Sequence, residues 1–232
     1  MLAGIKEQHK QGGAIQLTVI DLRTPPVAPD LLAEFLSADE RERAGRFRFP
    51  HLRERFRNGR GMLRHLLAQI CGIAPEDLDF AYSEKGKPSL PEFSELAFNV
   101  SHSGDLWACA TGWGAPLGID IEQIRPMPDC ELIARRFFAP SECSALSCFP
   151  EPGKPAAFFR CWTRKEAYIK ALGDGLSRDL GSFTVSFVDE EFSQVRDFVT
   201  AEQWQVRSFE PAPGYAGALV TRGVARVLRE PR

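Results

Sequence analysis

Apolar residues recur along this chain with two spacings, one typical of helices and one typical of strands. Between residues 58 and 70 they lie three and four positions apart, which predicts a packed helix that ends at Gly72. A second helix is predicted over Phe158–Leu172 and ends at Gly173. A basic helical segment is expected to begin at Ser37-Ala-Asp-Glu40.

Short apolar runs bounded by turn residues predict strands in both halves of the chain. The predicted strands are Ile15–Leu22, Leu78–Ser83, Leu96–Val100, Leu106–Thr111, Leu117–Ile121, Phe183–Val188, Trp204–Phe209 and Ala216–Thr221. In each half a helix closes on glycine and strands follow, so we expect an α+β fold of two similar halves related by pseudo-two-fold symmetry. Each half would pack a helix on a small, mainly antiparallel sheet, with residues 1–115 forming the first half and residues 116–232 the second.

Composition and charge narrow the class of protein. Apolar residues make up 44% and charged residues 26%, an ordinary globular composition, and no apolar run is long enough to span a membrane. The N-terminus lacks the apolar core of a secretory signal. The six cysteines form no C-x-x-C pattern, so we expect free thiols in a cytoplasmic protein, and the two-half plan favours a monomer.

A basic stretch stands out against a net charge of −2. Between Glu40 and His65 there are nine arginines and three glutamates. Helical arginines on a solvated face, an RNA surface or a site for a compact polyphosphate would each account for it. The near balance of charge over the whole chain gives no reason to expect a nucleic-acid partner.

Two carboxylates alternate in the run Gly118-Ile-Asp-Ile-Glu122. On a strand Asp120 and Glu122 share one face while the isoleucines point to the other. Such a pair suits a hard divalent cation such as Mg²⁺, and it equally suits the solvated edge of a sheet.

The helical run Trp162–Lys170 places Glu166 and Lys170 four residues apart on one face. A surface ion pair accounts for them, and so does a metal ligand next to a phosphate contact. The run Phe98-Asn-Val-Ser-His-Ser103 offers hydroxyls and an imidazole at the end of a strand, where a turn can hold phosphate. A structural histidine is the alternative reading of His102.

Taken in order, the three runs resemble the three motifs of the 4′-phosphopantetheinyl transferases, and the repeated plan resembles their long, Sfp-type form. The resemblance covers roughly Arg41–Leu176. Further segments match the family: Gly59-Arg60, Leu63-Arg64, Leu66-Leu67-Ala68, Gly86-Lys87-Pro88, and Arg136-Phe137-Phe138 followed by Glu142. Asp174 departs from it, because a basic or small residue is common there.

The resemblance implies transfer of the phosphopantetheine arm of coenzyme A to a serine of an apo carrier protein. Asp120, Glu122 and Glu166 would hold Mg²⁺, with Mn²⁺ as the alternative, on the pyrophosphate of coenzyme A. Lys170 would be catalytic beside it. Glu166 matches the proposed general base, a role that water on the metal could also fill. The implied contacts to coenzyme A are Arg55, Arg60, Lys87, Ser101, His102, Lys165 and Lys170.

Carrier docking is expected on residues 124–138, where basic and apolar side chains would complement an acidic carrier. The residues expected there are Arg125, Arg135, Arg136 and Phe137. Other readings are a Mg²⁺-dependent phosphohydrolase, a binding module built on the arginines, and a degenerate relative that only binds coenzyme A. The intact carboxylate set argues against the last.

Overall fold

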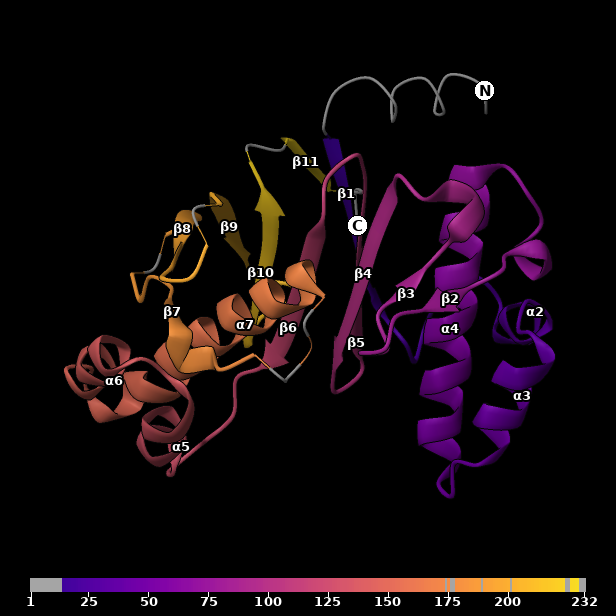
Figure 1. Cartoon of the computed structure of the whole chain (residues 1–232). Coiled ribbons are helices and arrows are strands. Elements are labelled where there is room, and N and C mark those ends of the chain that lie inside the picture. The colour runs from indigo at the N-terminus through magenta and orange to yellow at the C-terminus, as the bar shows by residue number, and fades with distance from the viewer. Residues whose placement is uncertain are drawn as a thin grey trace.

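The computed structural model describes residues 14–173, 175, 178–188, 190–200, 202–223 and 226–229. Two sheets stand side by side, and one long helix packs on each (Figure 1). The helices are α2 (Pro29–Glu34), α3 (Ala38–Gly45), α4 (Pro50–Cys71), α5 (Cys130–Phe137), α6 (Pro140–Ser147) and α7 (Lys154–Leu172). The strands are β1 (Ala14–Asp21), β2 (Ala81–Tyr82), β3 (Pro88–Ser89), β4 (Leu96–Ser103), β5 (Leu106–Trp113), β6 (Leu117–Gln123), β7 (Phe183–Thr184), β8 (Phe192–Asp197), β9 (Trp204–Phe209), β10 (Tyr215–Arg222) and β11 (Arg226–Arg229).

The first sheet has the order β11-β1-β5-β4 and carries α4 on one face. Apolar side chains of α4, among them Met62 and Leu67, pack against Phe98 and Trp107 of the sheet. Helix α2 lies against α4, and a Cβ at Gly61 would come within 2.5 Å of the backbone oxygen of Leu32. The absence of a side chain at Gly61 therefore lets α2 and α4 pack closely.

The second sheet has the order β6-β10-β9-β8-β7 and carries α7. Gly118 of β6 lies directly under this helix, because a Cβ there would meet the backbone oxygen of Ala167 at 2.1 Å and the nitrogen of Ala171 at 2.4 Å. Only glycine permits so close an approach. The last two turns of α7 are therefore pressed onto the strand that carries Asp120 and Glu122.

The two sheets also share a core on the faces away from their helices. Ile15, Leu17 and Ala110 of the first sheet cluster with Ile119 and Ile121 of the second. Burial of this shared face fixes the edge strand β4 beside the edge strand β6.

The α+β class is confirmed, with mainly antiparallel sheets, whereas the pseudo-two-fold relation is not. The sheets differ in strand number, and β11, from the end of the chain, pairs in parallel with β1. Strand β11 thus crosses the division at 115/116, which stays a prediction. Asp174 lies outside the described residues.

Several elements differ from their predicted bounds. Helix α4 begins at Pro50 rather than Asn58, because its first turns bury no residue and so lack an apolar period. Leu78–Ser83 and Phe183–Val188 contain only the two-residue strands β2 and β7. The short helices α5 and α6 and strand β8 were not predicted.

Within the described residues, the six cysteines form no disulfide with one another. Within the described part of the chain, no helix is long and apolar enough to cross a membrane.

Candidate active site

Side chains of β4, rather than the backbone of β4, bind the free edge of β6. Asn99 Oδ1 accepts a hydrogen bond from the N–H of Ile119 at 2.9 Å. Ser101 Oγ and Ser103 Oγ accept from the N–H groups of Ile121 at 3.2 Å and Gln123 at 3.0 Å. Three side chains at alternate positions of one strand therefore satisfy three backbone donors of the next. We call this set of contacts the β4–β6 ladder.

The same serines orient the two carboxylates of β6. Ser101 Oγ donates to Asp120 Oδ1 at 2.8 Å, and Ser103 Oγ donates to Glu122 Oε2 at 2.7 Å. Asp120 is buried and Glu122 is partly buried. Each serine thus joins a carboxylate to the backbone of the residue that follows it, so the ladder sets the direction in which both carboxylates point.

Helix α7 brings a lysine and a third carboxylate to this edge. Lys170 Nζ lies 2.7 Å from Asp120 Oδ1 and 3.2 Å from both Ser101 Oγ and the Ile119 carbonyl oxygen. Glu166 lies one turn earlier on the helix, close enough for Asp120 and Glu122 to raise its pKa. The three motif runs therefore meet at one place, as the sequence indicated.

Burial of these carboxylates shifts their protonation. Loss of water contact, followed by repulsion from Asp120, raises the pKa of Glu166 to about 7, while Lys170 opposes the shift. Burial also raises the pKa of Asp120 and of Glu122, and the charge of Lys170 offsets part of the effect at Asp120. The site concentrates negative charge in a region that water reaches poorly.

The donor set fits a hard divalent cation. Asp120 Oδ2 and Glu166 Oε1 are buried and have no hydrogen-bond partner among the described residues. Orphaned carboxylate oxygens beside a third carboxylate are the oxygen ligands that Mg²⁺ and Mn²⁺ prefer. As the side chains stand, the described residues hold no group of three or more His, Cys, Asp or Glu close enough to form a metal centre. Lys170 contacts Asp120 instead.

His102 and Arg55 lie at the end of the β4–β5 hairpin. His102 is exposed, because alternation along β4 turns its side chain away from Ser101 and Ser103. Arg55 of α4 forms an ion pair with Asp105, 2.5 Å from Nη2 to Oδ1. Partial desolvation, together with the charges of Lys170 and Arg55, lowers the pKa of His102. The neutral form of the imidazole is therefore favoured, and Lys170 and Arg55 are the nearby cations that lower its pKa.

Three other predicted contacts are engaged elsewhere. Lys165 is fully buried, with its Nζ 2.7 Å from Glu142 Oε2 and 2.8 Å from the carbonyl oxygens of Leu180 and Phe183. Arg60 pairs with Glu40 and donates to Tyr82 Oη at 2.7 Å. Lys87 binds the end of α7.

The predicted docking residues are all exposed. Arg135, Arg136 and Phe137 lie on the last turn of α5, and Arg125 lies on the segment that precedes it. A pocket of about 710 Å³ opens beside them, lined by Met127, Leu132, Arg135, Glu151 and Lys154 among others.

Asn99 and Ser103 were missed as site residues by sequence reasoning. Their signal was present, because Asn99, Ser101 and Ser103 are polar residues at alternate positions, although the predicted strand ended at Val100 and so contained only Asn99. The alternation could have indicated a shared polar face, although not the strand that it contacts.

The comparisons with known proteins agree with this geometry. Residues 116–220 match the family described as the 4′-phosphopantetheinyl transferase superfamily, and residues 26–113 match the 4′-phosphopantetheinyl transferase N-terminal family. The chain is 39% identical to 4′-phosphopantetheinyl transferase HetI of Nostoc sp., over 90% of this chain and 88% of the relative.

Two Bacillus proteins are similar over nearly the same extent. The chain is 34% identical to 4′-phosphopantetheinyl transferase psf-1 of Bacillus pumilus, over 90% of this chain and 88% of the relative. It is 32% identical to 4′-phosphopantetheinyl transferase Sfp of Bacillus subtilis, over 80% of this chain and 81% of the relative.

The raised pKa of Glu166 predicts a pH-dependent stability in metal-free buffer. The folded state holds the proton of Glu166 up to about pH 7, whereas the ordinary value is 4.5, so this group's contribution to stability falls as the pH rises between those values. Glu166→Gln stays neutral and should therefore gain stability relative to the unsubstituted protein between pH 5 and pH 8.

Urea unfolding with EDTA at pH 5, 6, 7 and 8 measures this difference. Glu54→Gln, at an exposed position of α4, is the control and should follow the unsubstituted protein throughout. A constant offset between Glu166→Gln and the unsubstituted protein would contradict the raised pKa.

Proposed function

This chain belongs to the 4′-phosphopantetheinyl transferase superfamily, and from that premise we propose that it moves the 4′-phosphopantetheine group of coenzyme A to a serine of an apo carrier protein. The other product is adenosine 3′,5′-bisphosphate. The observation that carries the proposal is the meeting of Asp120, Glu166 and Lys170 at the β4–β6 ladder.

The reaction is a phosphoryl transfer with a simple balance. The serine oxygen forms a bond to the phosphorus that carries pantetheine, and the bond from that phosphorus to the bridging oxygen of the pyrophosphate breaks. The serine proton must leave, and the adenosine-side phosphate takes the electron pair. Such reactions depend on positioning and on positive charge next to the transferred group.

Asp120, Glu122 and Glu166 would hold Mg²⁺ or Mn²⁺, which supplies positive charge to the pyrophosphate when bound. We assign Glu166 a second role as acceptor of the serine proton. Without a metal ion, burial and the neighbouring carboxylates raise its pKa to about 7, so it takes up a proton more readily than an exposed glutamate. Burial of its carboxylate supports this role, because burial makes proton uptake easier.

Lys170 would exchange its contact with Asp120 for the pyrophosphate oxygens. Its ammonium group already lies between Asp120 and Ser101, so only a short movement of a flexible side chain is needed. Ser101 would then be free to contact a phosphate from its place in the ladder. His102 and Arg55 provide positive or hydrogen-bonding groups for the phosphates on the adenosine side.

Intact-protein mass spectrometry tests the proposal. An apo carrier protein incubated with this chain, coenzyme A and Mg²⁺ should gain the mass of one phosphopantetheine group. The mass gain should disappear with EDTA. In Lys170→Met the rate of modification should fall by at least about a hundredfold, because the positive charge next to the transferred group is lost. Glu54→Gln is the control and should keep full activity.

Fatty-acid, polyketide and peptide carriers should each be offered in this assay. Modification of at least one supports the proposal. Absence of any gain, together with release of phosphate from simple phosphate esters, would contradict it and favour a phosphohydrolase.

We further propose that the carrier docks on the surface formed by Arg125, Arg135, Arg136 and Phe137. Exposed Leu132 and Phe137 offer apolar contact, and the arginines complement an acidic partner. The double substitution Arg135→Glu with Arg136→Glu should raise the KM for the carrier about tenfold or more and leave the KM for coenzyme A unchanged.

Arg46→Glu is a matched control for that experiment. Arg46 is an exposed arginine that pairs with a glutamate four residues before it, as Arg135 does. It lies directly after α3 and should leave the carrier KM unchanged. An unchanged carrier KM in the double variant would place the docking surface elsewhere.

A further inference from the structure

Lys87 connects the first half of the chain to the catalytic helix of the second. Its Nζ donates to the carbonyl oxygens of Lys170 at 2.6 Å and Ala171 at 3.0 Å. Both carbonyls belong to the last turn of α7, which also carries the side chain of Lys170. The ammonium group therefore binds the backbone of the residue whose side chain reaches Asp120.

The end of α7 needs such a donor. The last carbonyls of a helix have no partner within it, and a positive charge there interacts favourably with the helix dipole. Gly173 ends α7 in the left-handed conformation, at φ +83°, and its N–H binds the carbonyl of Ile169 at 3.0 Å. Lys87, from another part of the chain, supplies the hydrogen-bond donor for the next two carbonyls. Partial burial lowers the pKa of Lys87, which indicates that the ammonium is drawn out of water into this contact.

The turn between β2 and β3 is built to hold Lys87 in this place. Ser83 closes the turn through two hydrogen bonds to the backbone of Lys87. Its N–H donates to the carbonyl of Lys87 at 3.0 Å, and its Oγ accepts from the N–H of Lys87 at 3.1 Å. A Cβ at Gly173 would lie 3.5 Å from Lys87 Cδ, and one at Gly175 would lie 3.5 Å from Lys85 Cβ. The turn is packed against the chain that follows α7.

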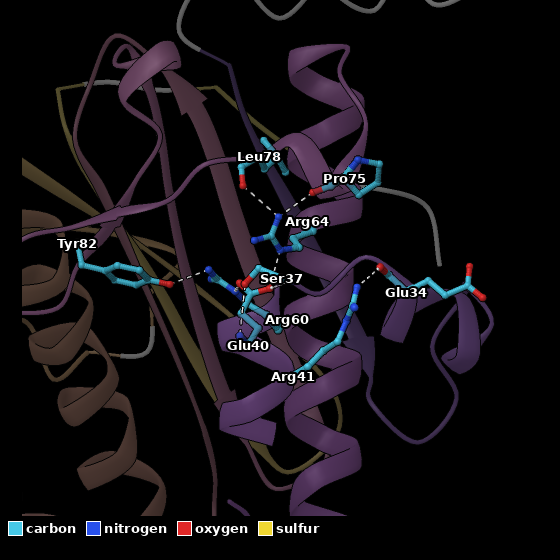
Figure 2. A network of polar contacts seen from close by, with 9 residues as sticks. All are labelled: Glu34, Ser37, Glu40, Arg41, Arg60, Arg64, Pro75, Leu78 and Tyr82. Atoms are coloured by element: carbon cyan, nitrogen blue, oxygen red, sulfur yellow. Dashed lines mark hydrogen bonds and ion pairs between the residues drawn. The ribbon is translucent and has the colours of Figure 1, made fainter. Parts of the chain in front are cut away.

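A buried ion cluster holds the segment that leads into this turn (Figure 2). Glu40 pairs with Arg60 and with Arg64, whose side chains are 12% and 4% exposed. Arg64 donates to the carbonyl oxygens of Pro75 and Leu78 at 2.8 and 3.1 Å.

Arg60 holds the strand that follows. It donates to Tyr82 Oη at 2.7 Å, and its guanidinium carbon lies 3.9 Å from the centre of the Phe80 ring. Residues 75–82 are thus fixed to α3 and α4 immediately before the turn, so a contact made by Lys87 is made from a rigid support.

We propose that Lys87 is a positioning residue, which caps the last turn of α7 and so fixes Lys170 against Asp120, with the Glu40–Arg60–Arg64 cluster as its anchor. The proposal rests on the proposed function for the role of Lys170 alone, because the cap itself is present without any ligand. It differs from the expectation that the Lys87 side chain contacts coenzyme A, since Lys87 Nζ donates to two carbonyl oxygens of α7.

Hydrogen–deuterium exchange on the free protein tests the cap. Lys87→Gln should speed exchange in peptides that cover residues 169–173 by about tenfold or more, and leave α4 unchanged. Lys85→Gln is the matched control, because Lys85 is an exposed lysine of the same turn. Lys87→Arg keeps a cationic donor and should restore part of the protection.

Steady-state kinetics on the same variants separates positioning from binding. If Lys87 positions Lys170, Lys87→Gln lowers kcat about tenfold at an unchanged thermal midpoint and leaves the KM for coenzyme A within about twofold. If Lys87 is a ligand of coenzyme A, KM rises and exchange at 169–173 does not change, which would overturn the proposal.

A third outcome separates this proposal from the proposed function. Faster exchange in Lys87→Gln with no transferase activity in the unsubstituted protein would keep the cap and remove the function. Unchanged exchange in Lys87→Gln with an active unsubstituted protein would remove the cap and keep the function.

Discussion

The site depends on the β4–β6 ladder, which joins two sheets whose facing edge strands are not paired through their backbones. Strand β6 presents the N–H groups of Ile119, Ile121 and Gln123 at its free edge, and each is bound by a polar side chain of β4. A buried N–H without a partner costs roughly 1–3 kcal/mol, so these side chains stabilise the junction as a neighbouring strand would. They also leave the hydroxyls of Ser101 and Ser103 free to donate to Asp120 and Glu122. Alignment of the carboxylates is therefore a consequence of joining the halves.

Burial of like charges follows from that arrangement. Loss of water contact is the main reason that the pKa values of Asp120, Glu122 and Glu166 are raised, and the charge of Asp120 adds to the shift at Glu122 and at Glu166. Serine hydroxyls and the ammonium of Lys170 oppose these shifts. Lys170 is in turn held by the close approach of α7 to Gly118 and by the cap that Lys87 provides. Buried carboxylates next to an ammonium group suit the site to a cation and a polyphosphate.

The sequence predicted the parts of the site better than their neighbours. The same-face placement of Asp120 with Glu122 followed from strand alternation, and the approach of Glu166 and Lys170 followed from the resemblance to a family. The pairing of β4 with β6 through side chains could not be predicted, since it depends on a core shared by two sheets. Lys165 and Lys170 look alike in the sequence, yet the facing of α7 buries one against Glu142 and turns the other to Asp120. Strand β11 was missed because its partner lies at the other end of the chain.

Divalent-cation affinity of Asn99→Ala tests most directly whether the ladder aligns the carboxylates. The Asn99 side chain accepts a hydrogen bond from the N–H of Ile119, and Ser147→Ala, an exposed change in α6, is the control. Titration calorimetry with Mn²⁺ should show a loss of affinity of roughly tenfold in Asn99→Ala, as expected when support behind metal ligands is removed. Full Mn²⁺ affinity in a folded Asn99→Ala protein would contradict the account, because the carboxylates would then be aligned without the ladder.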